Sequence, residues 1–137
     1  MKYLLDTNIV SYLLRGQFEN LEQQILNTAH DQVCISVITA GELAYGFARA
    51  KPSRRLVSMQ AKLGTLLQAI ETRPLPDGAG GQYGQIRSTL EKKGTPIGGN
   101  DLWLAAHALE DDLVLVTNNT QKFERVEGLK LENWVTS

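Results

Sequence analysis

Cysteine and long hydrophobic runs are both scarce in this sequence. Cys34 is the single cysteine among 137 residues, which excludes an internal disulfide bond. Chains without disulfides are typical of the reducing cytoplasm, where we expect this protein. No apolar run approaches the roughly 20 residues that a membrane helix needs, and the apolar start of MKYLLDTNIV is broken by Asp6. We therefore expect neither a membrane span nor a signal peptide.

An excess of positive charge is also lacking. The 14 Lys and Arg residues against 15 Asp and Glu residues give a net charge of −1. A strongly basic chain would have suggested nucleic-acid binding, but a balanced chain does not exclude it, because bound metal ions can supply positive charge near a phosphate. The basic residues gather in one stretch, which we interpret as a solvated helix face: Arg49, Lys51, Arg54, Arg55 and Lys62.

Short apolar segments alternate with helical patterns along the whole chain. The strands are predicted at Lys2–Leu5, Gln32–Ser36, Ile70–Leu75, Leu113–Val116 and near Leu129–Leu131. Between them, apolar residues recur at the spacing of amphipathic helices. This alternation predicts an α/β sandwich with a mainly parallel central sheet. The length fits a single domain that spans residues 1–137.

Polar residues follow the predicted strands where a parallel sheet places its binding sites. Asp6-Thr7-Asn8 follows the first strand, and Thr117-Asn118-Asn119 follows the strand at 113–116. Glu42 lies early in the helix after the second strand, and Asp101 follows the glycine-rich connection before another helix. We expect all four segments to face one cleft.

The three acids in these segments suggest a metal site. Mg²⁺ prefers oxygen ligands, and a cation among Asp6, Glu42 and Asp101 would relieve their mutual repulsion. Asn119 or Asn118 could add a neutral oxygen or order a water molecule. Each residue also has a simpler interpretation: Asp6 as a helix cap, Glu42 as an ordinary helix residue, Asp101 as an acid at a helix N-terminus, and the asparagines as a turn.

Other chemistries find less support. His30 and His107 have no partner motif for zinc, and Cys34 has the setting of a core thiol. Ser36 and Thr39 have no base nearby in the sequence, which argues against a nucleophile triad. The Gly98-Gly99 pair lacks the Lys-Ser/Thr of a phosphate loop.

Four segments, in order along nearly the whole chain, resemble the VapC toxins of bacterial toxin–antitoxin modules, which are PIN-domain proteins. They are LLDTNIVSYLL, ISVITAGELAYG, PIGGNDLWLAAHAL and LVTNNTQKFERVEGLKLENW. The resemblance implies a PIN-like three-layer α/β/α sandwich and an endoribonuclease that depends on Mg²⁺ or Mn²⁺ and stops translation. It matches Asp6, Glu42 and Asp101 to the acidic metal ligands of the family. A fourth acid found after the late strand of many PIN domains is absent from Thr117-Asn118-Asn119, so we expect one Mg²⁺ rather than two.

The resemblance also implies roles for neighbouring residues and partners. Thr7, Asn8, Thr117 and Asn118 would orient ligands and water. The implied partners are a second copy of the chain, giving a homodimer, and a VapB antitoxin whose tail occupies the active-site groove. The expected substrate is RNA, and sequences of this style resemble enzymes that cut initiator tRNA in its anticodon loop.

The hypothesis is therefore hydrolytic, in-line attack on an RNA phosphodiester, with Asn119 orienting water or substrate. Arg87 and Lys92 or Lys93 are candidates for phosphate contacts, although surface salt bridges explain them equally well. A haloacid-dehalogenase-like phosphotransferase is disfavoured because Asn8 stands where it needs a second Asp. A phosphoreceiver domain needs paired early acids that are not evident. A binding module that retains only the fold is disfavoured by the presence of all three acids.

Overall fold

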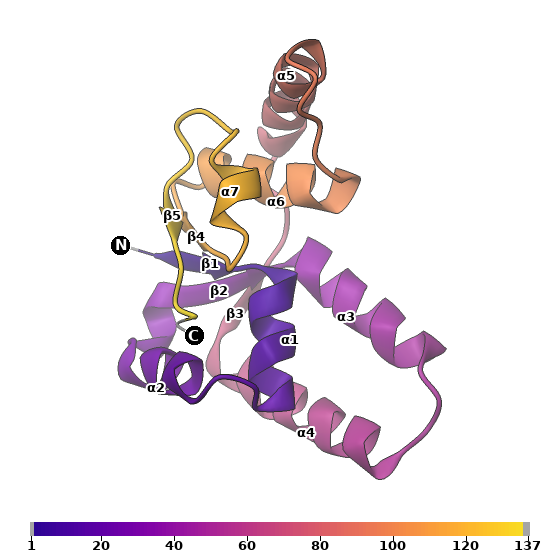
Figure 1. The fold of residues 1–137 in the computed structure, drawn as a ribbon. Coiled ribbons are helices and arrows are strands. Elements are labelled where there is room, and N and C mark those ends of the chain that lie inside the picture. Colours follow the sequence, from indigo (N-terminus) through magenta and orange to yellow (C-terminus); the bar gives the residue numbers. More distant parts are fainter. Residues whose placement is uncertain (1, 136–137) are drawn as a thin grey trace.

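A five-stranded parallel sheet forms the centre of the computed structural model, which describes residues 2–135 (Figure 1). Its strands lie in the order β3-β2-β1-β4-β5, and every neighbouring pair is parallel. In the central register, Leu4 of β1 pairs with Cys34 of β2 on one side and with Leu115 of β4 on the other. The strands are β1 (Tyr3–Leu5), β2 (Val33–Ser36), β3 (Glu71–Arg73), β4 (Val114–Val116) and β5 (Leu131–Glu132). The predicted parallel sheet is confirmed.

Within the described residues 2–135, seven α-helices cover the two faces of this sheet and complete three layers (Figure 1). The helices α1 to α4 lie on one face, and α5 to α7 lie on the other. Their bounds are α1 (Thr7–Arg15), α2 (Glu19–Asn27), α3 (Val37–Arg49), α4 (Arg54–Ala69), α5 (Ala79–Lys92), α6 (Gly99–Glu110) and α7 (Thr120–Phe123). A short 3-10 turn, η1 (His30–Gln32), precedes β2. The predicted α/β/α sandwich is confirmed.

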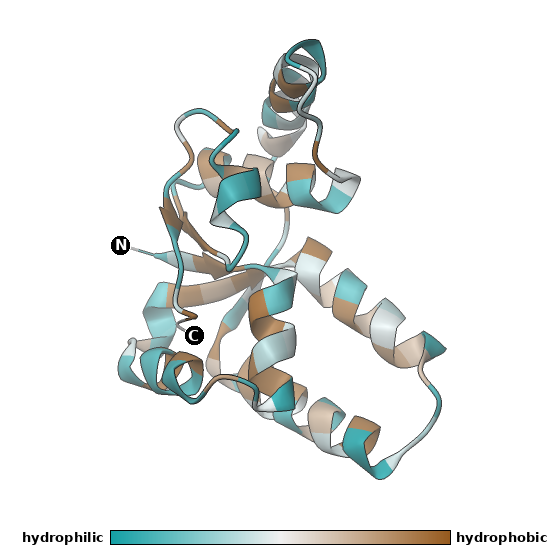
Figure 2. Ribbon diagram, in the orientation of Figure 1, coloured by the Kyte–Doolittle hydropathy of each residue, from teal (hydrophilic) through white to brown (hydrophobic). Residues whose placement is uncertain are grey.

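Each face of the sheet has its own hydrophobic core. Ile9, Leu21 and Leu43 belong to the core under α1 to α4, whereas Leu90 and Leu102 belong to the core under α5 to α7. The strands β1, β2 and β4 are buried on both faces and are mostly hydrophobic (Figure 2). This is the usual character of parallel strands with helices on both sides.

Helix ends agree with the capping signals in the sequence. The Asp6 side chain accepts a hydrogen bond from the Ile9 amide at the start of α1, and Gly16 ends α1 with a left-handed φ of 65°. Helix α4 begins at Arg54, because Ser53 is its cap and accepts from the Leu56 amide at 3.0 Å.

The last strand differs slightly from its predicted position. It lies at Leu131–Glu132 rather than near Leu129–Leu131. Gly128 turns the chain with a φ of 81°, and Leu129 still belongs to the turn that closes on the Val126 carbonyl. Within residues 2–135, no helix has the length and hydropathy required to cross a membrane.

Candidate active site

Asp6 lies where β1 ends and α1 begins, and its side chain is only 4% exposed. Its backbone N–H donates to the Val116 carbonyl at 3.0 Å, which fixes it beside the end of β4. Its Oδ1 accepts from the Ile9 amide at 2.8 Å, so the simple role of helix cap is real. Burial raises the pKa of Asp6, hydrogen bonds from the Thr117 hydroxyl and the Ile9 amide lower it, and the negative charge of Asp101 raises it further. Asp6 is thus a buried acid facing a second acid.

Asp101 lies in the first turn of α6, with its side chain 31% exposed. Its Oδ2 accepts a hydrogen bond from Nζ of Lys122 on α7 at 2.6 Å. The negative charge of Asp101 raises the pKa of Asp6 and the positive charge of Lys122 lowers it, so both groups act on Asp6 electrostatically. Two predicted acids therefore lie toward the carboxyl edge of the sheet and interact through their charges, and the ammonium of Lys122 is bonded to one of them.

Sequence reasoning missed Lys122. The sequence analysis assigned it no role. Its spacing of three residues after Asn119, in the polar segment that follows β4, is the one signal that could have pointed to it.

Glu42 reaches the site through Thr7. The Thr7 hydroxyl donates to Glu42 Oε1 at 2.6 Å and lies 3.1 Å from the hydroxyl of buried Thr39. Within residues 2–135, however, no three Asp, Glu, His or Cys side chains are grouped closely enough to hold a metal ion. The expected convergence of three carboxylates is therefore not seen, and the role of Glu42 as a ligand stays a prediction.

The polar segment after β4 organises α7. The Asn119 amide donates to Thr117 Oγ1 at 3.0 Å, and Asn119 Oδ1 accepts from the Lys122 amide at 3.3 Å as the cap of α7. Asn118 Oδ1 accepts from Asn133 Nδ2 at 3.2 Å, and Asn8 is exposed on α1. Thr117 and Asn119 thus join the Asp6 end of the site to Lys122, and their roles toward water or substrate remain predictions.

The donor set of the Asp6–Asp101 pair suits a hard divalent cation. Mg²⁺ in enzymes usually uses one or two carboxylates and completes its shell with waters and substrate phosphate oxygens. Two neighbouring acids supply those carboxylates, and Asp101 already binds one positive group, the ammonium of Lys122. Glu42 is hydrogen-bonded to Thr7, the residue that follows Asp6.

A groove of about 720 Å³ runs from this edge between α1, α3 and α4. Thr7 and Glu42 line it, as do four basic residues of α1, α3, α4 and the α3–α4 connection: Arg15, Arg49, Lys51 and Arg55. Three of these belong to the basic stretch that the sequence analysis interpreted as a solvated helix face. In the structure they surround a cavity that contains part of the candidate site.

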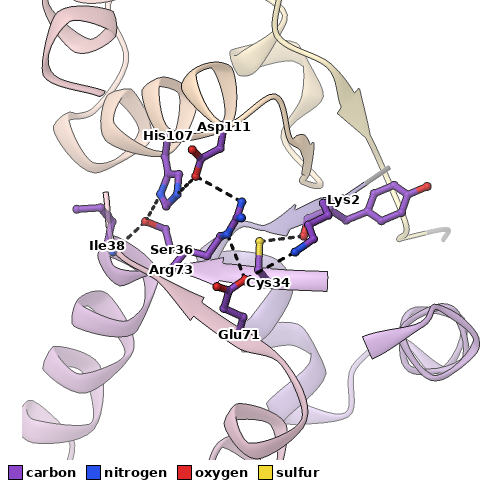
Figure 3. Close-up of polar contacts among 9 residues, drawn as sticks. Lys2, Cys34, Ser36, Ile38, Glu71, Arg73, His107 and Asp111 are labelled. Carbon is purple, nitrogen blue, oxygen red and sulfur yellow. Dashed lines mark hydrogen bonds and ion pairs between the residues drawn. The ribbon is translucent and has the colours of Figure 1, made fainter. Parts of the chain in front are cut away.

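A second polar cluster lies inside the fold, behind the site (Figure 3). Ser36 Oγ is 2.9 Å from His107 Nδ1, and His107 Nε2 is 3.1 Å from Asp111 Oδ2. Arg73 lies 3.4 Å from the same Asp111 oxygen and 3.1 Å from Glu71. Ser36 therefore does have a base beside it, contrary to the sequence analysis. Both Ser36 and His107 are fully buried, however, so this cluster is structural and cannot reach a polymer.

Residues named as other candidates have ordinary surroundings. Arg87 donates to Glu91 at 3.0 Å and to the Tyr83 hydroxyl at 3.0 Å, as expected for a surface salt bridge. Burial raises the pKa of the Cys34 thiol to about 11, which makes it an unreactive core residue. His30 is exposed at the start of η1.

Comparison with known proteins gives one consistent family. The model of the PIN domain matches residues 3–129. Ribonuclease VapC2 of Haemophilus influenzae is 38% identical over 136 residues, covering 98% of this chain and 99% of the relative. The tRNA(fMet)-specific endonuclease VapC of Salmonella typhimurium is 36% identical, with 98% of each chain covered. The crystal structure of VapBC2 from Rickettsia felis bound to a promoter DNA fragment contains a chain with a TM-score of 0.87 and 36% identity, over 98% of this chain and 99% of that chain.

Proposed function

The chain belongs to the PIN-domain family and, within it, to the VapC ribonucleases, and from this premise we propose that it is a metal-dependent endoribonuclease of a toxin–antitoxin module. The observation that carries the proposal is the pairing of buried Asp6 with Asp101 at the carboxyl edge of a parallel sheet. Burying a carboxylate such as Asp6 within the field of a second carboxylate is costly unless a cation accompanies the pair. A structural helix cap would need only one of them.

We assign the roles of the residues as follows. Asp6 and Asp101 would hold Mg²⁺ or Mn²⁺, which when bound would neutralise charge on the scissile phosphate and lower the pKa of the attacking water. Glu42, which accepts from the Thr7 hydroxyl at 2.6 Å, would complete the ligand set or accept a proton from that water. The Thr117 hydroxyl lowers the pKa of Asp6 against the larger opposite effect of burial, and Asn119 would orient water or substrate.

The basic groove supports RNA as the substrate. Arg15, Arg49, Lys51 and Arg55 line the same cavity as Thr7 and Glu42, so a phosphate backbone bound along it would pass the acids. We propose tRNA as the RNA, since the Salmonella typhimurium and Shigella flexneri relatives are tRNA(fMet)-specific endonucleases. Cleavage in the anticodon loop of initiator tRNA is the expected result, because protein recognition of RNA sequence favours unstacked loops.

We further propose that a VapB antitoxin neutralises the enzyme by occupying the groove. Several structurally similar chains come from VapBC complexes, including those of Rickettsia felis and Salmonella typhimurium. A homodimer in the cytoplasm is the assembly and location that the family resemblance implies. The molar mass from light scattering would reveal the homodimer in the chain alone, and a further increase in mass after addition of antitoxin would reveal the complex.

Asp6→Asn tests the proposed chemistry. Asparagine keeps the side-chain oxygen that caps α1 and removes the charge that a cation needs. We expect cleavage of a tRNA pool to fall at least about 100-fold, the upper end of the effect of outer-shell partners of metal ligands, with the circular dichroism spectrum unchanged. Wild-type cleavage should stop with EDTA and return with Mg²⁺ or Mn²⁺.

The matched control is Asp112→Asn. Asp112 is an exposed acid paired with Lys130 beyond the C-terminal end of α6, opposite to the end that carries Asp101, and its positive φ of 52° is tolerated by asparagine. This variant should cut at the wild-type rate. Cleavage by Asp6→Asn at that same rate, or wild-type cleavage that continues in EDTA, would contradict the proposed function and favour a binding module.

A further inference from the structure

Lys122 is held in the active site by two contacts. Its Nζ donates to Asp101 Oδ2 at 2.6 Å and lies 5.2 Å from the centre of the Phe123 ring. The side chain is 24% exposed, and that of Asp101 is 31% exposed. A second Lys–Asp pair with a similar distance, Lys130–Asp112, is 50% and 83% exposed. The Lys122 pair is therefore shielded from solvent in a way that the surface pair is not.

Anchoring of α7 does not account for this contact. The short helix is already capped by Asn119, whose Oδ1 accepts from the Lys122 amide. It is also held to the core by Phe123, which is 1% exposed. A lysine that served only to attach α7 would add little to a helix fixed at both of these points.

The charges at the site favour a different role. Asp6, Glu42 and Asp101 carry three formal negative charges when ionised, and the ammonium of Lys122 leaves two. One divalent cation balances that remainder. The ammonium also donates a hydrogen bond to Oδ2 of Asp101, a proposed metal ligand. A divalent cation that binds Asp101 must therefore share this carboxylate with Lys122 or displace the ammonium.

We propose that Lys122 is a resident cation of the active site that competes with the divalent metal for Asp101 and so sets the affinity of the site for that metal. This inference rests on the proposed function, because it assumes that Asp6 and Asp101 bind a metal. In the metal-free chain Lys122 offsets the repulsion between the two acids. In the metal-loaded chain its positive charge lowers metal affinity and disfavours a second ion.

The experiment measures Mn²⁺ binding to the intact chain by isothermal titration calorimetry, without RNA. Lys122→Met removes the charge and keeps most of the apolar stem. We expect Mn²⁺ to bind about tenfold more tightly or better, as expected for removal of one positive charge a few ångströms from a divalent ion. Lys122→Arg, which keeps the charge, should bind within about threefold of wild type. Lys130→Met is the matched control and should leave the affinity unchanged.

Thermal unfolding supplies a second readout that does not depend on cleavage. Without metal, Lys122→Met leaves Asp6 and Asp101 unbalanced, so its Tm should be lower than that of wild type. Saturating Mn²⁺ should raise the Tm of Lys122→Met by more than it raises the Tm of wild type or of Lys130→Met. If Lys122→Met does not fold without metal, Lys122→Gln, which retains a donor to Asp101, replaces it in both measurements.

The possible failures are distinguishable. Equal Mn²⁺ affinities and equal Tm gains for wild type and the uncharged variants would overturn the role of Lys122 and leave the metal site standing. Absence of Mn²⁺ binding in every variant, including Lys122→Met, would overturn the proposed metal site itself. Tighter binding in Lys122→Met with loss of that binding in the double variant Asp6→Asn/Lys122→Met would support both.

Discussion

At the residue scale, the buried polar side chains of this protein gather near one edge of the sheet. Asp6, Ser36 and Thr117 end strands β1, β2 and β4, while Thr39 and His107 lie on the helices behind them. Burying polar groups is costly unless each finds a hydrogen-bond partner. Among residues 2–135, every buried side-chain nitrogen and oxygen has one. The buried polar side chains at this edge of the sheet are thus accommodated by specific hydrogen bonds.

His107 is the titratable member of this set. Burial lowers its pKa, and the opposing attraction of Asp111 raises it, with burial the larger effect. Since the Asp111 carboxylate can only accept at Nε2, neutral His107 carries its proton there and accepts at Nδ1 from the Ser36 hydroxyl. Ser36 in turn accepts from the Ile38 amide, so every member of the chain is satisfied when His107 is neutral.

The lowered pKa predicts how stability depends on pH. The folded state takes up the His107 proton at a lower pH than the unfolded state does, so its contribution is present above pH 6.5 and is lost as pH falls below that value. His107→Gln removes this titration and disturbs the buried contacts, and we expect it to cost about 1–3 kcal/mol at pH 7.5. Urea unfolding between pH 7.5 and 5 should show the gap between wild type and variant shrinking toward acid. Comparing the two proteins cancels the opposite contribution of Asp6. A gap that stays constant over this range would contradict the buried neutral histidine.

At the element scale, three of the helices that begin beside the candidate site are capped by side chains, and two of these side chains, Asp6 and Ser36, also interact with a residue of α6. Asp6 caps α1 and faces Asp101, Ser36 caps α3 and meets His107 of α6, and Asn119 caps α7 at the amide of Lys122. Through Ser36 and His107, the helix that carries Glu42 is tied to the helix that carries Asp101. The spacing of those two acids therefore depends on a buried contact between residues 71 positions apart.

Ser36→Ala measures how much the contact between Ser36 and His107 contributes to the free energy of unfolding, and Ser53→Ala is its matched control. Both serines cap a helix, but Ser53 is exposed and bonds only to the Leu56 amide, whereas Ser36 is fully buried against His107. Loss of an N-cap costs about 1 kcal/mol, and a buried acceptor left without its donor adds about 1–3 kcal/mol. We expect chemical denaturation to show a clearly larger loss for Ser36→Ala than for Ser53→Ala. Equal losses would mean that the contact with His107 contributes nothing to stability.

The same elements explain how far the sequence could be interpreted. The strands β1, β2 and β4 are continuous apolar runs, and caps and glycines such as Asp6 and Gly16 mark helix ends by local chemistry, so these features could be predicted. The edge at which the acids meet follows from strand direction alone. The contacts of Lys122 and His107 could not be predicted, because they depend on how α6 and α7 lie across the sheet. Strand β3 was a weak prediction since its residues are exposed or half-buried and lack an apolar pattern.

At the scale of the whole molecule, charge is balanced in number but not in position. The net charge is −1, yet the groove of about 720 Å³ is lined by Arg15, Arg49, Lys51 and Arg55 with Glu42 as its one acid. A separate basic pair, Lys92 and Lys93, lies at the end of α5 on the opposite face of the sheet, outside that groove. The two groups offer alternative paths for an RNA backbone, and only the first runs past Thr7 and Glu42.

Neutralising each group in turn decides between these paths. Lys51→Gln/Arg55→Gln removes two charges from the groove, and Lys92→Gln/Lys93→Gln removes two from α5, so both variants change the net charge equally. Phosphate contacts release counterions, and each contact to a single strand contributes about −0.7 to the slope of log affinity against log salt concentration. We expect the groove variant to lower kcat/KM on tRNA about tenfold at moderate salt and to flatten its salt dependence by about 1.4, two such contacts. The α5 variant should stay close to wild type in both. If the α5 variant shows the larger loss and the flatter slope, RNA crosses the other face, and the groove would serve the antitoxin without serving the substrate.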